Sequence, residues 1–251
     1  MRRTIQFSAG ALWVLMGVPA FPSDSLLVVN RGLPQYNLNN AAGKARSNVR
    51  WGVPDSGFVG DGFTIGAPGE RWVIDSIRTW AVPGIANHVP DHLADFFEDV
   101  RLYVGGSDAD LTPISTARLK PGSDQTGNAN VRISEAAQSG AAAYDDFGAN
   151  LRVWQVEFGD LNLTVEGGVP YQFGVWGMGR AAPGTDDKTY TWYNHASNAP
   201  LSGTVQDGAS GAMRLFDAAG HSAGVFNSEG HGWDKPANIN VQIYAHRVSQ
   251  Q

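Results

Sequence analysis

Residues 239–246 read Ile-Asn-Val-Gln-Ile-Tyr-Ala-His, and this stretch indicates the fold class. From Ile239 onward, apolar residues at every second position alternate with polar or aromatic ones. A period of two is the pattern of a β-strand that has one buried face and one face in water. Residues 100–104 and 161–166 show the same alternation. We therefore expect half-buried strands at these three places.

Turn-forming residues are distributed over the rest of the chain. The sequence has 31 glycines and 13 prolines with short apolar runs between them, as in proteins built of many short strands. A pattern of about ten strands with no alternating helices predicts an all-β fold, an antiparallel jelly-roll-like β-sandwich. One short helix is expected from Asp91 to Phe97, with Asp91 as its N-cap. Less regular strands are predicted at residues 26–29, 71–82, 130–133, 151–158, 171–178, 190–193 and 213–216.

The first twenty residues have the order of a secretory signal peptide. Arg2 and Arg3 precede an apolar stretch over residues 5–18, and Ala20 follows as a small residue at the expected cleavage site. The stretch is shorter than the about 20 apolar residues that a membrane span needs. We therefore expect a secreted or periplasmic protein without a membrane span, and a single β-sandwich domain over residues 21–251.

The charge and the cysteine content of the chain argue against several classes of partner and of chemistry. The chain has 24 acidic and 18 basic side chains and a formal net charge of −6. Nucleic acids and anionic lipids are bound by basic patches, so we expect neither as a partner. Because the chain has no cysteine, disulfides, thiolate metal sites and cysteine catalysis are excluded.

Several segments together resemble a family of proteins. They are Gly62-Phe63-Thr64-Ile65 and residues 72–77, 97–103, 154–158, 171–175, 194–198 and 232–235, followed by the strand at 239–245. In this combination they resemble uncharacterised exported β-sandwich proteins of Gram-negative bacteria, many of which carry a C-terminal PEP-CTERM sorting segment. This chain ends Ala-His-Arg-Val-Ser-Gln-Gln, without that segment. The resemblance implies a β-sandwich and export, and it implies no particular biochemical activity.

A group of aromatic residues is the candidate ligand-binding surface. Tyr190, Trp192, Tyr193 and His195 lie close together in the chain, and Trp233 lies in a glycine-rich turn. In a strand, Tyr190 and Trp192 would share one face and Tyr193 and His195 the other. Aromatic rings give sugars a flat apolar platform with a polar edge. We expect at least one of the two tryptophans to be exposed beside a groove; the alternative is that both belong to the core.

Acidic loop residues are the candidate metal ligands. Asp108 and Asp110 are separated by one residue in a predicted loop, and carboxylate oxygens are the ligands that calcium prefers. Acidic residues are also common in turns for reasons of backbone geometry alone. We therefore expect either no cofactor or calcium at Asp108 and Asp110.

Three sets of residues have the types that certain enzymes use, so an enzyme is the alternative interpretation. Residues 220–224 match the G-x-S-x-G string of serine hydrolases, but no helical pattern follows Ser222 as that chemistry requires, so a turn is the interpretation. Glu157 lies on a strand and could serve a glycosidase, which needs a second carboxylate as a partner. Tyr244, His246 and Arg247 supply the residue types of a polysaccharide lyase.

The sequence therefore predicts an exported noncatalytic protein that binds or builds something outside the inner membrane. Polysaccharide or another envelope component is the candidate partner. The alternative is a jelly-roll polysaccharide lyase or glycoside hydrolase. An enzyme would show groups that converge on the floor of a cleft, whereas a binding module would show a flat or shallow face.

Overall fold

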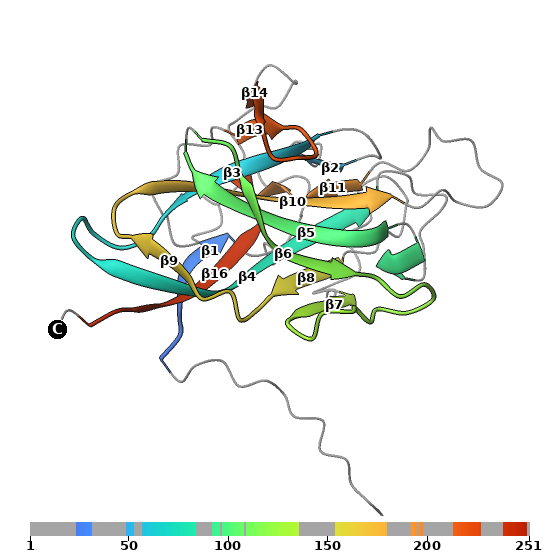
Figure 1. The fold of residues 1–251 in the computed structure, drawn as a ribbon, viewed down its shortest axis with the longest axis horizontal. Helices are drawn as coiled ribbons and strands as arrows, with labels where there is room; N and C mark the ends of the chain where they lie inside the picture. Colours follow the sequence, from blue (N-terminus) through green and yellow to red (C-terminus); the bar gives the residue numbers. More distant parts are fainter. Residues whose placement is uncertain are drawn as a thin grey trace, which may run out of the picture.

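The fold is all-β, as the alternating segments predict. The computed structural model describes residues 24–31, 49–52, 57–83, 92–95, 97–107, 109–135, 154–179, 192–194, 196–197, 213–226 and 238–249. Over these residues the chain forms sixteen strands and one 3-10 helix, η2 (Leu93–Asp95). Every strand pair is antiparallel, and the strands form two large sheets (Figure 1).

The eight-stranded sheet is arranged around one long central strand, β4 (Arg71–Pro83). One edge of β4 pairs with β16 and β11, and the other edge pairs with β8 and β9. Its other members are β1 (Leu26–Arg31), β2 (Val49–Gly52), β7 (Val131–Glu135), β8 (Trp154–Phe158), β9 (Leu163–Glu166), β11 (Trp192–Asn194) and β16 (Val241–Arg247).

The six-stranded sheet has the strand order β14-β13-β3-β10-β5-β6. Its strands are β3 (Phe58–Thr64), β5 (Phe97–Gly106), β6 (Thr112–Arg118), β10 (Pro170–Gly179), β13 (Met213–Phe216) and β14 (Ser222–Phe226). A small third sheet pairs β12 (Ala196–Ser197) with β15 (Asn238–Ile239).

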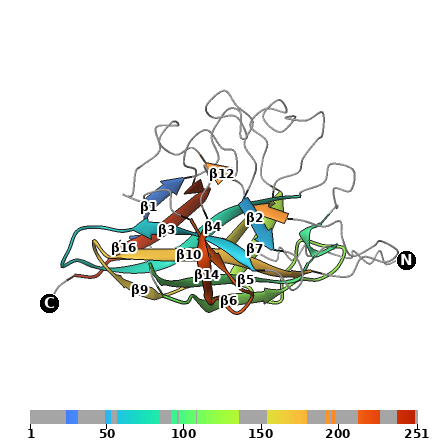
Figure 2. The same cartoon turned by 90° about the horizontal axis from the view of Figure 1, so that it is seen from above.

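The topology is that of a jelly roll. β1 pairs with β16, β3 with β10, β4 with β8 and β9, and β5 with β6. These pairs are those of one long hairpin rolled into two sheets, β1-β16-β4-β8/β9 and β3-β10-β5-β6. β1, β16 and β2 lie on one side and β5 and β6 on the other (Figure 2). The predicted jelly-roll β-sandwich is therefore confirmed.

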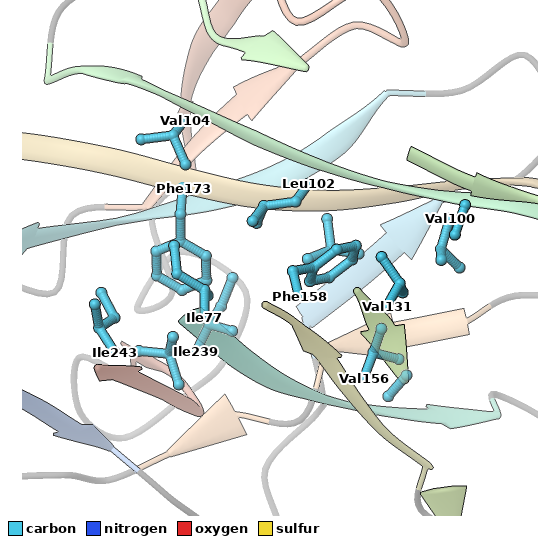
Figure 3. Packing of buried hydrophobic residues seen from close by; sticks show 14 of the residues in the cluster. Ile77, Val100, Leu102, Val104, Val131, Val156, Phe158, Phe173, Ile239 and Ile243 are labelled. Atoms are coloured by element: carbon cyan, nitrogen blue, oxygen red, sulfur yellow. The ribbon is translucent and has the colours of Figure 1, made fainter. Parts of the chain in front are cut away.

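The hydrophobic core lies between the two large sheets. Ile77, Val156 and Ile243 of the eight-stranded sheet face Leu102 and Phe173 of the six-stranded sheet in one buried cluster (Figure 3). These residues occupy alternate positions of their strands, so their neighbours in the chain point to the outer faces. The core thus fixes which side chains the eight-stranded sheet presents outward.

A second apolar cluster covers the outer face of the six-stranded sheet. Phe58, Tyr103 and Phe216 are buried there, with ring centroids 4.8 and 5.4 Å from that of Phe58. The expectation that Tyr103 faces water is wrong, because Leu111 after β5 packs over this face and the Tyr103 hydroxyl donates to a carbonyl beyond β13. A glycine at position 174 is required, since a Cβ there would overlap the Phe58 ring.

A buried ion pair joins the two sheets inside the sandwich. Arg31, the last residue of β1, donates to Asp61 of β3 over 2.8 Å, and 1% of each side chain is exposed. Asp61 also accepts the backbone N–H groups of Gly62 and Ile239 over 2.8 and 2.7 Å. Charges in a core must be matched by such contacts. This carboxylate therefore anchors β1, β3 and β15 to one another.

The sequence anticipated most of the strands but missed several. All seven of the less regular strands predicted from the sequence lie within a strand or overlap one, while β2, β3, β6, β12 and β14 were not foreseen. The expected helix is one 3-10 turn, Leu93–Asp95, because β5 already begins at Phe97. The proposed cap Asp91 and the signal segment lie outside the described residues. No helix in the described ranges is long and apolar enough to cross a bilayer.

The interior ion pair leads to a stability prediction. Asp61→Ala leaves the Arg31 guanidinium buried without its carboxylate, and we expect the free energy of unfolding to fall by about 3–5 kcal/mol. Glu166→Ala is the control, because its partner Arg71 lies 3.4 Å away with both side chains more than half exposed, and such pairs contribute about 1 kcal/mol or less. Urea denaturation measures both. Equal losses in the two variants would contradict this role of Asp61.

Candidate ligand-binding face

A row of five polar side chains crosses the outer face of the eight-stranded sheet. The strand register pairs Asn30 of β1 with Gln242 of β16, Gln242 with Arg78 of β4, Arg78 with Glu157 of β8, and Glu157 with Arg132 of β7. Cross-strand partners lie on the same face of a sheet. We call these five residues the polar ladder. At the usual strand spacing of about 4.8 Å it is roughly 19 Å long.

Hydrogen bonds join four of the five members. The Gln242 amide nitrogen donates to the Asn30 side-chain oxygen over 3.2 Å, and Arg78 Nη1 donates to the Gln242 side-chain oxygen over 3.0 Å. Two further Arg78 nitrogens donate to one Glu157 oxygen over 2.7 and 3.0 Å. The polar groups are therefore held in place by one another, which reduces the entropy that a ligand must remove on binding.

Two aromatic residues flank the ladder. The Arg78 guanidinium lies over the Tyr244 ring, 5.4 Å from its centroid, and its Nη1 is 3.4 Å from the Tyr244 hydroxyl. Tyr244 is half-buried, so part of its surface remains on the outer face. On the other side of the ladder Trp80 pairs with Gln155, and 5% of Trp80 is exposed. Of these two described rings, Tyr244 thus provides the accessible aromatic surface beside the ladder.

The residues considered for a lyase are divided between the two faces. Tyr244 and His246 share the outer face, as the sequence predicted, but the His246 ring nitrogen Nδ1 contacts both oxygens of Asp75 over 3.0 and 3.1 Å. Arg247 follows His246 in β16, so alternation points it to the other face, where it pairs with Glu70 over 3.1 Å. The three side chains therefore do not converge on one point.

The carboxylates of this face are engaged by protein groups. Glu157 is 7% exposed and accepts two guanidinium bonds from Arg78. Asp75 is 5% exposed and accepts bonds from Ser25 and His246. Asp75 lies three residues from Arg78 along β4, about 10 Å away. A glycosidase needs one acid and one base or nucleophile free to act on the same bond, and this arrangement does not present them.

Two of the predicted aromatic binding residues, Trp192 and Tyr193, lie in β11. Trp192 and Tyr193 pair along the backbone with Pro83 and Val82 of β4, which places their strand in the same sheet as the polar ladder. For these two residues the description covers the backbone. Tyr190, His195 and Trp233 lie outside the described residues. The expected exposure of Trp192 or Trp233 therefore stays a prediction.

Asp110, one of the two predicted calcium ligands, contacts the serine-hydrolase string at one end of the six-stranded sheet. Asp110 accepts the backbone N–H of Ser222 over 2.9 Å, and the N–H of Leu111 donates to the Gly220 carbonyl. Asp110 thus fastens the loop after β5 to the hairpin of β13 and β14, while Asp108 lies outside the described residues. Ser222 begins the hairpin strand β14, and His246 lies in the other sheet, so the two do not form a catalytic pair.

A histidine in the same hairpin has a perturbed pKa. The His221 ring nitrogen lies 2.9 Å from an Asp217 oxygen. This hydrogen bond, the charge of Asp217 and the more distant charge of Asp110 raise the pKa of His221 above its usual value. Backbone and side-chain hydrogen bonds from His221 lower the pKa of Asp217. Both side chains are more than half exposed, so the pair is a turn contact in water.

The His221 contact predicts a measurable pH dependence. Because the pKa is raised in the folded state, the contact stabilises the fold fully below about pH 6.5 and its contribution is lost as pH rises through the folded pKa. Asp217→Asn keeps an oxygen that can accept the backbone bonds, and we expect it to lower the pKa of His221 toward 6.5. Asp110→Asn should lower it less. Titration of the imidazole NMR signals measures this, and an unchanged pKa in Asp217→Asn would contradict the assignment.

Sequence alone did not single out most of the ladder. Arg78 interrupts an apolar run, Gln242 alternates with Val241 and Ile243, and Arg132 alternates with Val131 and Ile133. Each of these polar residues is visible as the wet face of one strand. Which of them share a row depends on the pairing of strands that are far apart in the chain.

Comparison with known protein families, curated proteins and solved structures found no match.

Proposed function

We propose that this protein is a noncatalytic binding protein for an extended polysaccharide, which lies along the polar ladder. The observation that supports this is the register of Asn30, Gln242, Arg78, Glu157 and Arg132 over five adjacent strands. The strand spacing of about 4.8 Å is close to the length of one sugar unit in an extended chain. The strands β1, β16, β4 and β7 can therefore offer polar groups to successive sugars, while the buried Glu157 of β8 orients Arg78.

The residue types suit hydroxyl-rich ligands. Amide and guanidinium groups are planar and carry several hydrogen-bond donors in fixed directions, so they can bond neighbouring hydroxyls of one sugar ring. The half-buried Tyr244 ring adds an apolar surface with a polar edge beside them. The bonds among Arg78, Gln242 and Asn30 hold these groups in position before a ligand arrives.

The contacts of the acidic groups support binding without catalysis. The carboxylates of Glu157 and Asp75 are each held by protein donors on this face. They can orient Arg78 and His246, and they are not aligned as an acid and a base around one bond. We therefore favour a binding module over the lyase or hydrolase that the sequence left as the alternative.

An envelope or extracellular polysaccharide is the ligand that fits the rest of the chain. The signal-like first twenty residues and the resemblance to exported β-sandwich proteins support a proposed function outside the inner membrane. The strand β11, which contains Trp192 and Tyr193, belongs to the same sheet as the ladder. A long polysaccharide chain would have room to contact both.

Binding assays with ladder variants test this function. Affinity electrophoresis in gels that contain xylan, a soluble β-glucan or polygalacturonate measures binding of the whole protein. Gln242→Ala removes one amide and Tyr244→Ala one ring, and we expect each to weaken binding roughly three- to tenfold. Tyr244→Phe keeps the ring and should retain most of the affinity. The length of the polysaccharide after incubation should be unchanged.

The matched control lies on the other sheet. Arg118 is exposed in β6, and Arg118→Ala should bind like the unaltered protein. Thermal melts of all variants verify that they fold. Wild-type binding by folded Gln242→Ala and Tyr244→Ala would contradict a site on the ladder, and shortened polysaccharide would show that the protein is an enzyme.

A further inference from the structure

The charges along the polar ladder are unequal from one end to the other. Asn30 and Gln242 are neutral, and Arg78 and Glu157 neutralise each other over 2.7 Å. Arg132 then adds one positive charge at the β7 end. The exposed Arg132 guanidinium forms no ion pair with any described residue, although Glu157 is its partner in the strand register. The ladder therefore ends in a cation that is available to a ligand.

The strand β7 places this cation well for contact with a polymer. β7 pairs with β8 and is an edge strand of the eight-stranded sheet among the described elements. Val131 and Ile133 on either side of Arg132 are buried in the core, which fixes the arginine on the outer face. Ser134 lies beside it on the same face and pairs with Gln155. A chain that follows the ladder thus passes Arg132 between Ser134 and Glu157, whose carboxylate is bonded by Arg78.

We infer that the polysaccharide is acidic and that one of its anionic groups binds Arg132; this rests on the proposed function. Guanidinium groups bind carboxylates and sulfate-like oxyanions with two parallel hydrogen bonds. The whole chain carries a net charge of −6 and repels polyanions at long range. An acidic polysaccharide is therefore bound where a positive charge is left uncompensated, and the ladder has one at Arg132.

A pair of polysaccharides that differ in charge tests the inference. Polygalacturonate and its fully methyl-esterified form have the same backbone, and dextran sulfate adds a sulfated arm. We expect the unaltered protein to bind polygalacturonate about tenfold more tightly than the methyl ester, because a charge-assisted bond is lost on esterification. Higher affinity for dextran sulfate than for plain dextran would identify sulfate as the anionic group. Added salt should narrow each difference.

Variants of Arg132 locate the contact. Arg132→Gln should reduce affinity for the acidic polysaccharide about tenfold and leave the methyl ester unaffected, whereas Arg132→Lys should lose less. Arg118→Gln is the matched control, since it removes an exposed arginine from the other sheet. Unchanged affinity in Arg132→Gln, or equal binding of acid and ester, would overturn the inference. If Gln242→Ala still weakened binding in that case, the proposed function would stand; if no polysaccharide bound at all, both would fail.

Discussion

The register between β4 and its two neighbours is the constraint on which the rest of the molecule depends. It places Ile77 beside Ile243 and Phe158 in the core and Arg78 beside Gln242 and Glu157 outside. A slip of one residue would turn Arg78 inward and Ile77 outward. Because burial of a large apolar side chain contributes about 1.5–3 kcal/mol, the core enforces the register. The polar ladder is aligned by the same packing that holds the sandwich together.

Strand β1 contributes adjacent residues to the core and to the polar ladder. Arg31 points into the sandwich and is bound by Asp61, while its neighbour Asn30 points outward and accepts from Gln242. Removing the inner contact would leave a buried charge unmatched and loosen the edge on which Asn30 lies. Stability and the proposed ligand binding are therefore coupled in this strand, because adjacent residues serve the core and the outer face.

How much the sequence could predict depended on the range of the interactions involved. Alternation at 239–246 indicated a strand and its inner face correctly, because it reflects burial of single residues. Asn240 was expected in water and is buried. Tyr103 was also expected in water and is buried, since Leu111 and Phe216, which pack with it, come from elsewhere in the chain. The ladder was not found for the same reason: Asn30 and Gln242 are 212 residues apart. Local periodicity identifies faces, whereas strand pairing determines which faces share a row.

The central claim is that a polysaccharide lies on the polar ladder. Titration of ¹⁵N-labelled protein with an oligomer of galacturonic acid, followed by NMR, tests it most directly. The side-chain amide signals of Asn30 and Gln242 should shift on binding, while that of Asn128, which bonds a carbonyl of β6 in the other sheet, should stay in place. Binding that leaves Asn30 and Gln242 unmoved and shifts signals of the six-stranded sheet would contradict the claim.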